Sequence, residues 1–181
     1  FSLALAKKWE ARGGKPWQIV ATCFDGREEL LTKYRHADEI LALLKEAQSS
    51  AEAIGCNLEV LAGVDATDIA TTLAAARSNS QQCLLGTRVE ASGPVEFDRV
   101  VFQFPHRGGK NFMGKNRALL RRFFTSATAV LAASGEVLVT LLLGQGGTEF
   151  ERLSLGRDRA PNSRKLTKRV HGDHWQLTEM A

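Results

Sequence analysis

An amide, an aromatic ring, a proline and an imidazole stand in succession at Gln103, Phe104, Pro105 and His106. An amide can hydrogen-bond the edge of a nucleobase, an aromatic ring can stack on its face, and an imidazole can accept a ring proton near neutral pH. Either Phe104 or Phe102 could supply the stacking ring. These residue types favour a site for an unstacked nucleobase, with Gln103, Pro105 and His106 as candidate catalytic residues.

A basic run follows this segment directly. Six cations and no acidic residue occur between positions 107 and 122, and a pair of glycines stands near the start of the run. Such a run suits a phosphate backbone, because each neutralised phosphate releases condensed counterions; a solvated helix face is the alternative explanation. The candidate RNA-binding residues are Arg107, Lys110, Lys115, Arg117, Arg121 and Arg122.

Two aspartates follow two other apolar runs. Asp25 closes the β-rich run at 17–24, where a carboxylate can accept hydrogen bonds from the two hydroxyls of a nucleoside ribose. Asp65 follows Gly63, where it can accept from an adenine amino group while the N–H of Ala66 meets a ring nitrogen. An ordinary Asp-Gly turn at Asp25 and a helix cap at Asp65 are the structural alternatives.

Strands and helices are expected to alternate along the chain and to position these groups. The apolar runs predict strands at 17–24, 58–62, 98–104 and 136–143. The periodicity predicts helices at 2–11, 28–54, 68–76 and 116–133, with a break near His36 and an irregular insertion at 78–94. Continuous apolar strands separated by helices predict a mostly parallel sheet with helices on both faces. Ligands bind beyond the carboxyl ends of such strands, so the candidate residues are expected to share one cleft.

The composition suits one compact domain and a polyanionic partner. The chain has 181 residues, 44% of them hydrophobic, and a formal net charge of +4. Cys23, Cys56 and Cys83 lie far apart and lack metal-ligand spacing, which argues against a zinc site or a disulfide framework. The most apolar run, 137–143, is much shorter than the ~20 residues of a membrane-spanning helix. Neither a metal nor a membrane is therefore expected as a partner.

Several segments in succession resemble one family, the large-subunit rRNA uracil-N3 methyltransferase-like domain, which is also found fused to a ferredoxin-fold anticodon-binding domain. The resembling segments are FSLALA at 1–6, ATCFD at 21–25, GVDAT at 63–67, FDRVVFQFPH at 97–106, KNRALL at 115–120 and GEVLVT at 135–140. The first resembles the end of the family's glycine-rich cofactor loop and the helix after it, and the next two resemble its second and third strands. The run at 97–106 is the most specific of them.

The resemblance implies a Rossmann-like, S-adenosylmethionine-dependent methyltransferase fold over residues 1–147, truncated at both ends. Residues 148–181 are then a basic linker and the start of a further helix. The expected substrate is a uracil of large-subunit rRNA, within a pre-ribosomal particle that holds other assembly factors. The expected location is the nucleolus or cytoplasm, with the mitochondrion as the alternative. The residues expected to bind S-adenosylmethionine are Phe1, Ser2, Asp25, Asp65 and Ala66.

The resemblance assigns a base to the reaction, because a uracil N3 is a poor nucleophile until its proton is lost. His106 is the candidate base, with Asp98 as a less likely partner because it begins its strand. Gln103 departs from the family, whose members often carry Asn there. One alternative function is an inactive methyltransferase-like protein that binds rRNA through 107–122 as a ribosome assembly factor. A third possible function is that of a nicotinamide-dependent oxidoreductase, which Asp25 alone would support.

Overall fold

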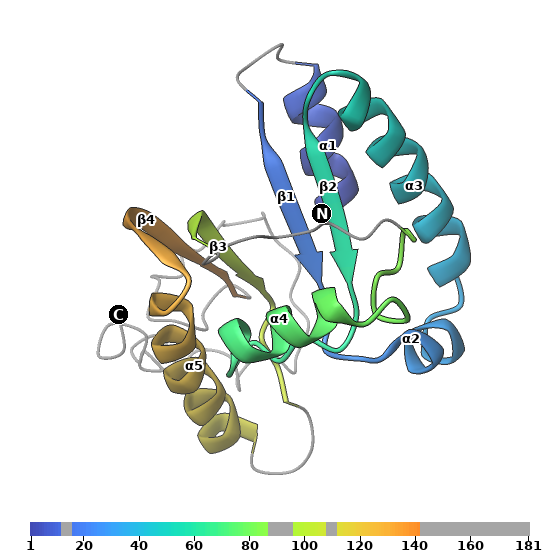
Figure 1. Ribbon diagram of the computed structural model, residues 1–181. Helices are drawn as coiled ribbons and strands as arrows, with labels where there is room; N and C mark the ends of the chain where they lie inside the picture. The colour runs from blue at the N-terminus through green and yellow to red at the C-terminus, as the bar shows by residue number, and fades with distance from the viewer. Residues whose placement is uncertain (12–15, 87–95, 108–111, 142–181) are drawn as a thin grey trace, which may run out of the picture. The chain divides into compact units, whose positions relative to one another are not determined.

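The computed structural model describes residues 1–11, 16–86, 96–107 and 112–141. The chain forms two compact units, Phe1–Val95 and Glu96–Ala181. Helices and strands alternate in both units (Figure 1). The strands pair in parallel in each unit, so the predicted α/β class with parallel strands is confirmed. No helix in the described part of the chain is long and apolar enough to cross a membrane.

Where the structure describes it, the first unit contains two parallel strands and four helices. In chain order these are α1 (Ser2–Glu10), β1 (Gln18–Thr22), α2 (Arg27–Lys33), α3 (Ala37–Ala53), β2 (Asn57–Leu61) and α4 (Ile69–Ser78). Gln18 lies opposite Asn57, and Thr22 lies opposite Leu61. The predicted break near His36 is confirmed, because α2 ends at Lys33 and α3 begins at Ala37.

Helices cover both faces of β2. On one face, Leu58 and Val60 belong to a buried cluster with Ala6 of α1 and Leu44 of α3. Glu59 points to the opposite face, since successive strand side chains alternate, and it pairs there with Arg77 of α4. All four residues of β2 after Asn57 are buried, as the prediction of a strand covered on both sides requires.

Gly55 ends α3, as the sequence predicts. Its φ of +74° is accessible to glycine without steric penalty. The N–H of Gly55 donates to the carbonyl of Glu52 at 3.1 Å, and that of Cys56 donates to Ala51 at 2.8 Å. This pair of bonds is a Schellman motif, which satisfies carbonyls that the helix leaves open and turns the chain into β2.

The segment after α4 contributes to the core of the first unit. Residues 79–86, the described part of the predicted insertion at 78–94, form turns, and Leu61 makes an antiparallel bridge to Cys83. Leu84 and Leu85 are each 6% exposed and join the cluster around β2. The segment is irregular, as expected, but it packs like core because its two leucines close the end of that cluster.

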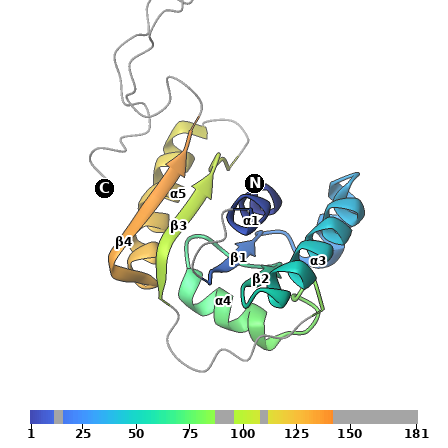
Figure 2. The same ribbon diagram turned by 90° about the horizontal axis from the view of Figure 1, so that it is seen from above.

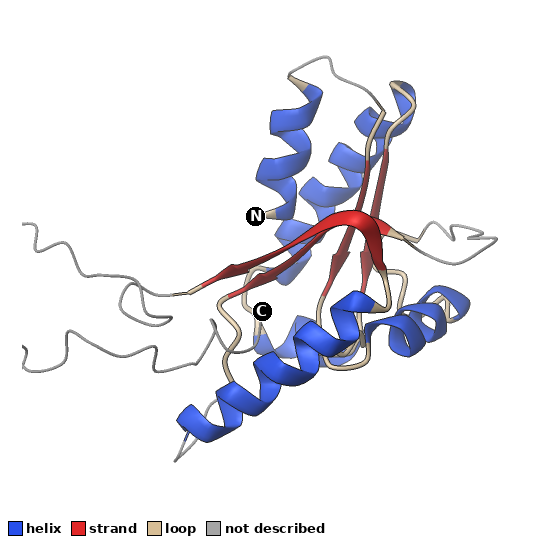
Figure 3. Ribbon diagram, turned by 90° about the vertical axis from the view of Figure 1, so that its left-hand side faces the viewer, coloured by secondary structure: helices blue, strands red, loops and turns tan. Residues whose placement is uncertain are grey.

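The second unit is a β-α-β arrangement. Its described residues form β3 (Phe97–Gln103), α5 (Phe112–Thr128) and β4 (Leu131–Thr140). Figures 2 and 3 show α5 along one face of the β3–β4 pair. The residues of α5 that recur at helical spacing and are at most 1% exposed are Asn116, Leu120, Phe123 and Ala127.

The predicted boundary between α5 and β4 is wrong. The sequence predicts a helix to 133 and a strand at 136–143, whereas the helix ends at Thr128 and the strand already begins at Leu131. The local sequence predicts that Gly135 ends a helix, but Gly135 lies inside β4. A Cβ added at this position would lie 2.8 Å from the Leu131 side chain. The strand curls there, because the β3–β4 register shifts between Phe97 and Arg99.

The described residues of the second unit do not show strands buried on both faces. Burial alternates along the second half of β4, and Leu138 is 45% exposed, while Val101 of β3 is 37% exposed. Within the described residues, α5 covers only one face of this strand pair.

Candidate cofactor and RNA sites

The loops after β1 and β2 are hydrogen-bonded to each other beyond the carboxyl ends of the two strands. The N–H of Val64 donates to the carbonyl of Cys23 at 2.9 Å, and that of Gly63 donates to the carbonyl of Asp25 at 3.2 Å. Asp65 follows two residues after Gly63. The parallel pairing therefore brings Asp25 and Asp65 to the same edge of the first unit, as the sequence predicts.

Asp25 faces a cation that sequence reasoning did not assign to it. Lys33, in the last turn of α2, donates to both carboxylate oxygens, with Nζ 3.0 Å from Oδ1 and 3.1 Å from Oδ2. Hydrogen bonding from Lys33 lowers the pKa of Asp25 below its ordinary value of 3.8. The Asp25 side chain is 12% exposed and that of Lys33 is 52% exposed. Asp25 is thus an ionised acceptor at neutral pH.

Asp65 shapes its own loop. Its Oδ1 accepts hydrogen bonds from the backbone N–H and the hydroxyl of Thr67, both at 2.8 Å. Its own N–H donates to the hydroxyl of Thr72 at 3.1 Å. The N-cap of α4 is Asp68, which makes no side-chain cap bond. The helix-cap alternative for Asp65 is therefore wrong, and the carboxylate instead closes an Asx turn around Ala66.

Phe1 and Ser2, the other predicted cofactor residues, open α1. The carbonyl of Phe1 accepts from the N–H of Leu5 at 2.8 Å, and the Phe1 side chain is 65% exposed. The N-terminal turn of α1 lies toward the arrowheads of β1 and β2 in Figure 1, at the end of the helix where backbone N–H groups are open to a ligand. Their role as cofactor ligands stays a prediction.

The segment after β3 leaves the strand abruptly. Gln103 is the last strand residue and lies opposite Thr140 of β4. Phe104 has a φ of +47° and is 54% exposed, whereas Pro105 is less than 2% exposed. His106 and Arg107 are exposed. The described part of the second unit thus presents the phenylalanine, the imidazole and the guanidinium at the strand end and buries the proline.

The structure separates the roles of the two candidate stacking rings. Phe102 is half-buried, and its ring centroid lies 4.7 Å from that of the buried Phe123 on α5. Phe104 points out of the fold. Since a nucleobase needs an accessible face, Phe104 is the better placed of the two rings for stacking.

Asn116 anchors the loop after β3. Its side chain is 0% exposed, and its Oδ1 accepts the backbone N–H of Arg107 at 2.9 Å. Its Nδ2 is buried and has no hydrogen-bond partner among the described residues. Sequence reasoning treated Asn116 only as the start of a helix. The available signal was a polar residue on the apolar stripe that Leu120, Phe123 and Ala127 continue.

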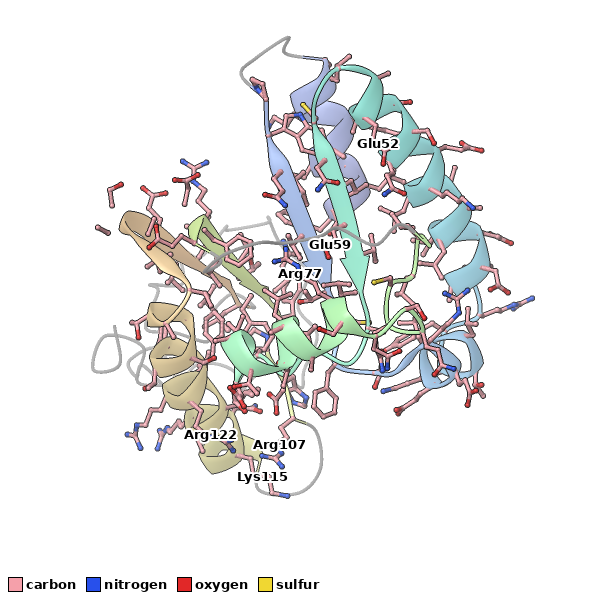
Figure 4. The ribbon with its side chains drawn as sticks, viewed as in Figure 1. Glu52, Glu59, Arg77, Arg107, Lys115 and Arg122 are labelled. Carbon is pink, nitrogen blue, oxygen red and sulfur yellow. The ribbon has the colours of Figure 1, made fainter. Side chains whose placement is uncertain are left out.

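The basic run lies on the loop after β3 and along α5. Arg107 and Lys115 lie at the same end of α5 in Figure 4, which also labels Arg122. Lys115, Arg121 and Arg122 are exposed, and Arg117 is half-buried. Lys110 lies outside the described residues. The prediction that Pro105 shares a cleft with Asp25 and Asp65 stays a prediction.

These features define an α/β protein with parallel strands, whose candidate ligand groups follow the strands' carboxyl ends. The model of the family described as BMT5-like, rRNA (uridine-N3-)-methyltransferase BTM5-like, matches residues 1–181. The chain therefore belongs to the BMT5-like rRNA (uridine-N3-)-methyltransferase family, and the predicted family membership is confirmed.

Three curated proteins are similar to parts of the chain. A 57-residue segment, 32% of the chain, is 54% identical to the ferredoxin-fold anticodon-binding domain-containing protein 1 homolog of Mus musculus. The ferredoxin-fold anticodon-binding domain-containing protein 1 of Homo sapiens is 53% identical to this chain over 57 residues. Each match spans only 9% of the mouse or human protein. An uncharacterized protein of Arabidopsis thaliana is 26% identical over 148 residues, which cover 77% of this chain and 56% of that protein. No solved structure is significantly similar to this chain.

Proposed function

We propose that this chain is an S-adenosylmethionine-dependent methyltransferase domain with a Rossmann-like fold, which methylates N3 of a uridine in large-subunit rRNA during ribosome biogenesis. The observation that carries the proposal is the family match over all 181 residues. Parallel strands in both units, with candidate ligand groups after their carboxyl ends, agree with this fold class.

The residues at the edge of β1 and β2 fit an adenosyl group. Ribose hydroxyls and an adenine amino group donate hydrogen bonds, and Asp25 and Asp65 are acceptors on adjacent, hydrogen-bonded loops. Hydrogen bonding from Lys33 lowers the pKa of the Asp25 carboxyl. Gly63 has a φ of +71°, and a Cβ there would lie 3.0 Å from Oε1 of Gln82. A glycine is therefore needed where the two loops meet.

In this proposal, residues at the end of β3 and after it bind the target uracil and remove its N3 proton. When bound, S-adenosylmethionine supplies an electrophilic methyl group, and the protein has to orient the uracil and remove its N3 proton. In the proposal the Gln103 amide hydrogen-bonds the uracil edge and His106 accepts the proton from N3. Pro105, buried against the fold, fixes the backbone between these two groups. The basic residues of α5 hold the flanking phosphates.

Calorimetry of S-adenosylmethionine binding tests the cofactor assignment. Asp25→Asn should weaken binding by about tenfold or more, because a hydrogen bond to a charged group contributes ~1.5–3 kcal/mol. Asp38→Asn is the matched control, because Asp38 is an exposed aspartate on α3. Equal affinity of the two variants would remove Asp25 from the cofactor site.

The reaction is tested by incubating the protein and a methyl-labelled cofactor with ribosomal RNA, followed by mass spectrometry of the nucleosides. The expected product is 3-methyluridine, and His106→Ala should abolish its formation while cofactor binding stays unchanged. Tight RNA binding without any methylated product would contradict the enzymatic proposal and support the inactive rRNA-binding alternative.

A further inference from the structure

The backbone of Phe104 adopts a conformation that an L-residue takes only when its surroundings hold it. Its φ is +47°, and it is the only non-glycine residue with a positive φ in the described part of the chain. Backbone outliers of this kind gather at ligand sites, where the conformation aims a side chain.

Contacts on both sides of Phe104 hold its backbone. The N–H of Phe104 donates to the carbonyl of Thr140 at the end of β4, at 2.9 Å. Pro105 is buried, and two residues further on the N–H of Arg107 donates to the Asn116 carboxamide at 2.9 Å. Asn116 is itself fully buried in α5. The loop is therefore clamped between β4 and α5, and Phe104 has little freedom to turn inward.

The clamped backbone keeps an apolar ring in water. Phe104 is 54% exposed, whereas Phe102, two residues earlier, is half-buried and its ring centroid lies 4.7 Å from that of Phe123. The ring lies at the carboxyl end of β3, the end of a parallel strand where ligands bind. This placement provides a rigid, accessible aromatic face before any ligand arrives.

The charge around the ring indicates its occupant. No Asp or Glu occurs in the sequence between Asp98 and Glu136, and exposed cations follow the ring at Arg107 and Lys115. A nucleobase joined to its phosphate presents a π-face and an anion together, and single-strand-binding proteins combine aromatic stacking with a cationic groove to match both.

We propose that Phe104 is a preformed stacking platform for an unpaired base of single-stranded RNA, and that Asn116 is the positioning residue that holds the platform in place. The proposal deepens the proposed function and depends on it only for the identity of the stacked base as the target uridine.

Replacing Phe104 with glycine gives the sharpest test, because glycine tolerates a positive φ and the ring is lost without backbone strain. The thermal unfolding midpoint of Phe104→Gly should equal or exceed that of the unmodified protein. Its affinity for a fluorescein-labelled single-stranded oligouridine, measured by anisotropy, should fall by about 5- to 150-fold. Phe104→Tyr keeps the ring and should keep the affinity.

A second RNA probe separates stacking from charge. An oligonucleotide of dihydrouridine has the same phosphates, but its bases are not planar. The unmodified protein should bind oligouridine more tightly than oligo-dihydrouridine, and Phe104→Gly should bind both equally. Asn116→Ala should lose the same preference, and Asn116→Asp, which keeps an acceptor oxygen for Arg107, should restore it.

The outcomes distinguish this proposal from the enzymatic one. If Phe104→Gly retains the affinity and the preference for uridine, the stacking platform is refuted, whether or not the protein makes 3-methyluridine. If Asn116→Ala retains the preference, the positioning role of Asn116 is refuted. If the preference depends on Phe104 while no 3-methyluridine forms, the platform stands and the enzymatic proposal fails.

Discussion

The ion pair between Glu59 and Arg77 offers a quantitative test of the packing on β2. The two residues are 3% and 8% exposed, and their side chains point toward each other in Figure 4. The Nε of Arg77 donates to Oε1 at 3.1 Å and to Oε2 at 3.0 Å, and its Nη2 donates to Oε2 at 2.7 Å. Replacing Arg77 with methionine would leave a carboxylate buried without its cation.

The expected loss of unfolding free energy for Arg77→Met is ~3–5 kcal/mol, as for other buried pairs that lose one partner. Two unit charges about 4 Å apart attract by ~4 kcal/mol at an effective dielectric of ~20, which is the same size. The double variant Glu59→Leu with Arg77→Met removes both charges. The double variant should regain most of the lost unfolding free energy, because it no longer buries an unpaired carboxylate.

Arg99 and Glu136 provide the matched control. Their Nε and Oε2 atoms are 3.2 Å apart, but the side chains are 59% and 61% exposed. Arg99→Met should therefore change the stability by less than ~1 kcal/mol. Urea unfolding followed by circular dichroism measures these differences, and amide hydrogen exchange in β2 and β3 reports each unit separately. The reasoning is refuted if Arg77→Met costs no more than Arg99→Met, or if the double variant is as unstable as the single one.

Three further predictions concern the two candidate sites. In an NMR titration, the Asp25 carboxyl should have a midpoint below 3.8, and this midpoint should rise in Lys33→Ala. Because the pKa of Asp25 is depressed in the folded state, its pairing with Lys33 stabilises the fold above pH 3.8. This stability is lost as the pH falls through the folded pKa. An unchanged midpoint would exclude Lys33 as the cause. Gly63→Ala should lower the urea midpoint by the equivalent of ~1–2 kcal/mol, because an L-residue is strained at its φ of +71°. Gly26→Ala is the control and should have little effect, because the φ of Gly26 is −67° and no atom lies within 4 Å of the added Cβ. Arg122→Ser should reduce the slope of log affinity against log salt for single-stranded RNA by ~0.7, and an unchanged slope would mean that Arg122 contacts no phosphate.

The sequence by itself determined the features that depend on neighbouring residues. Periodicity indicated the succession of helices and strands along the chain. Gly55 predicted the end of α3, because a helix terminus is formed by local hydrogen bonds. Asp25 and Asp65 could be placed after parallel strands because the order of elements implied their edge of the sheet. The resemblance carried by residues 97–106 led to the correct family.

Only the tertiary structure decided which distant groups meet. Residues 79–86 lack periodicity, and the burial of Leu84 and Leu85 depends on packing with Leu58 and Val60 of β2, which are distant in the sequence. Gly135 resembles a helix stop, yet it lies inside β4, where Leu131 and Glu136 on either side of it pair with β3. The exposed Phe104 and the half-buried Phe102 look alike in sequence. Contacts of the neighbouring backbone with β4 and α5 set them apart, because long-range packing and not residue type determines which ring can reach a ligand.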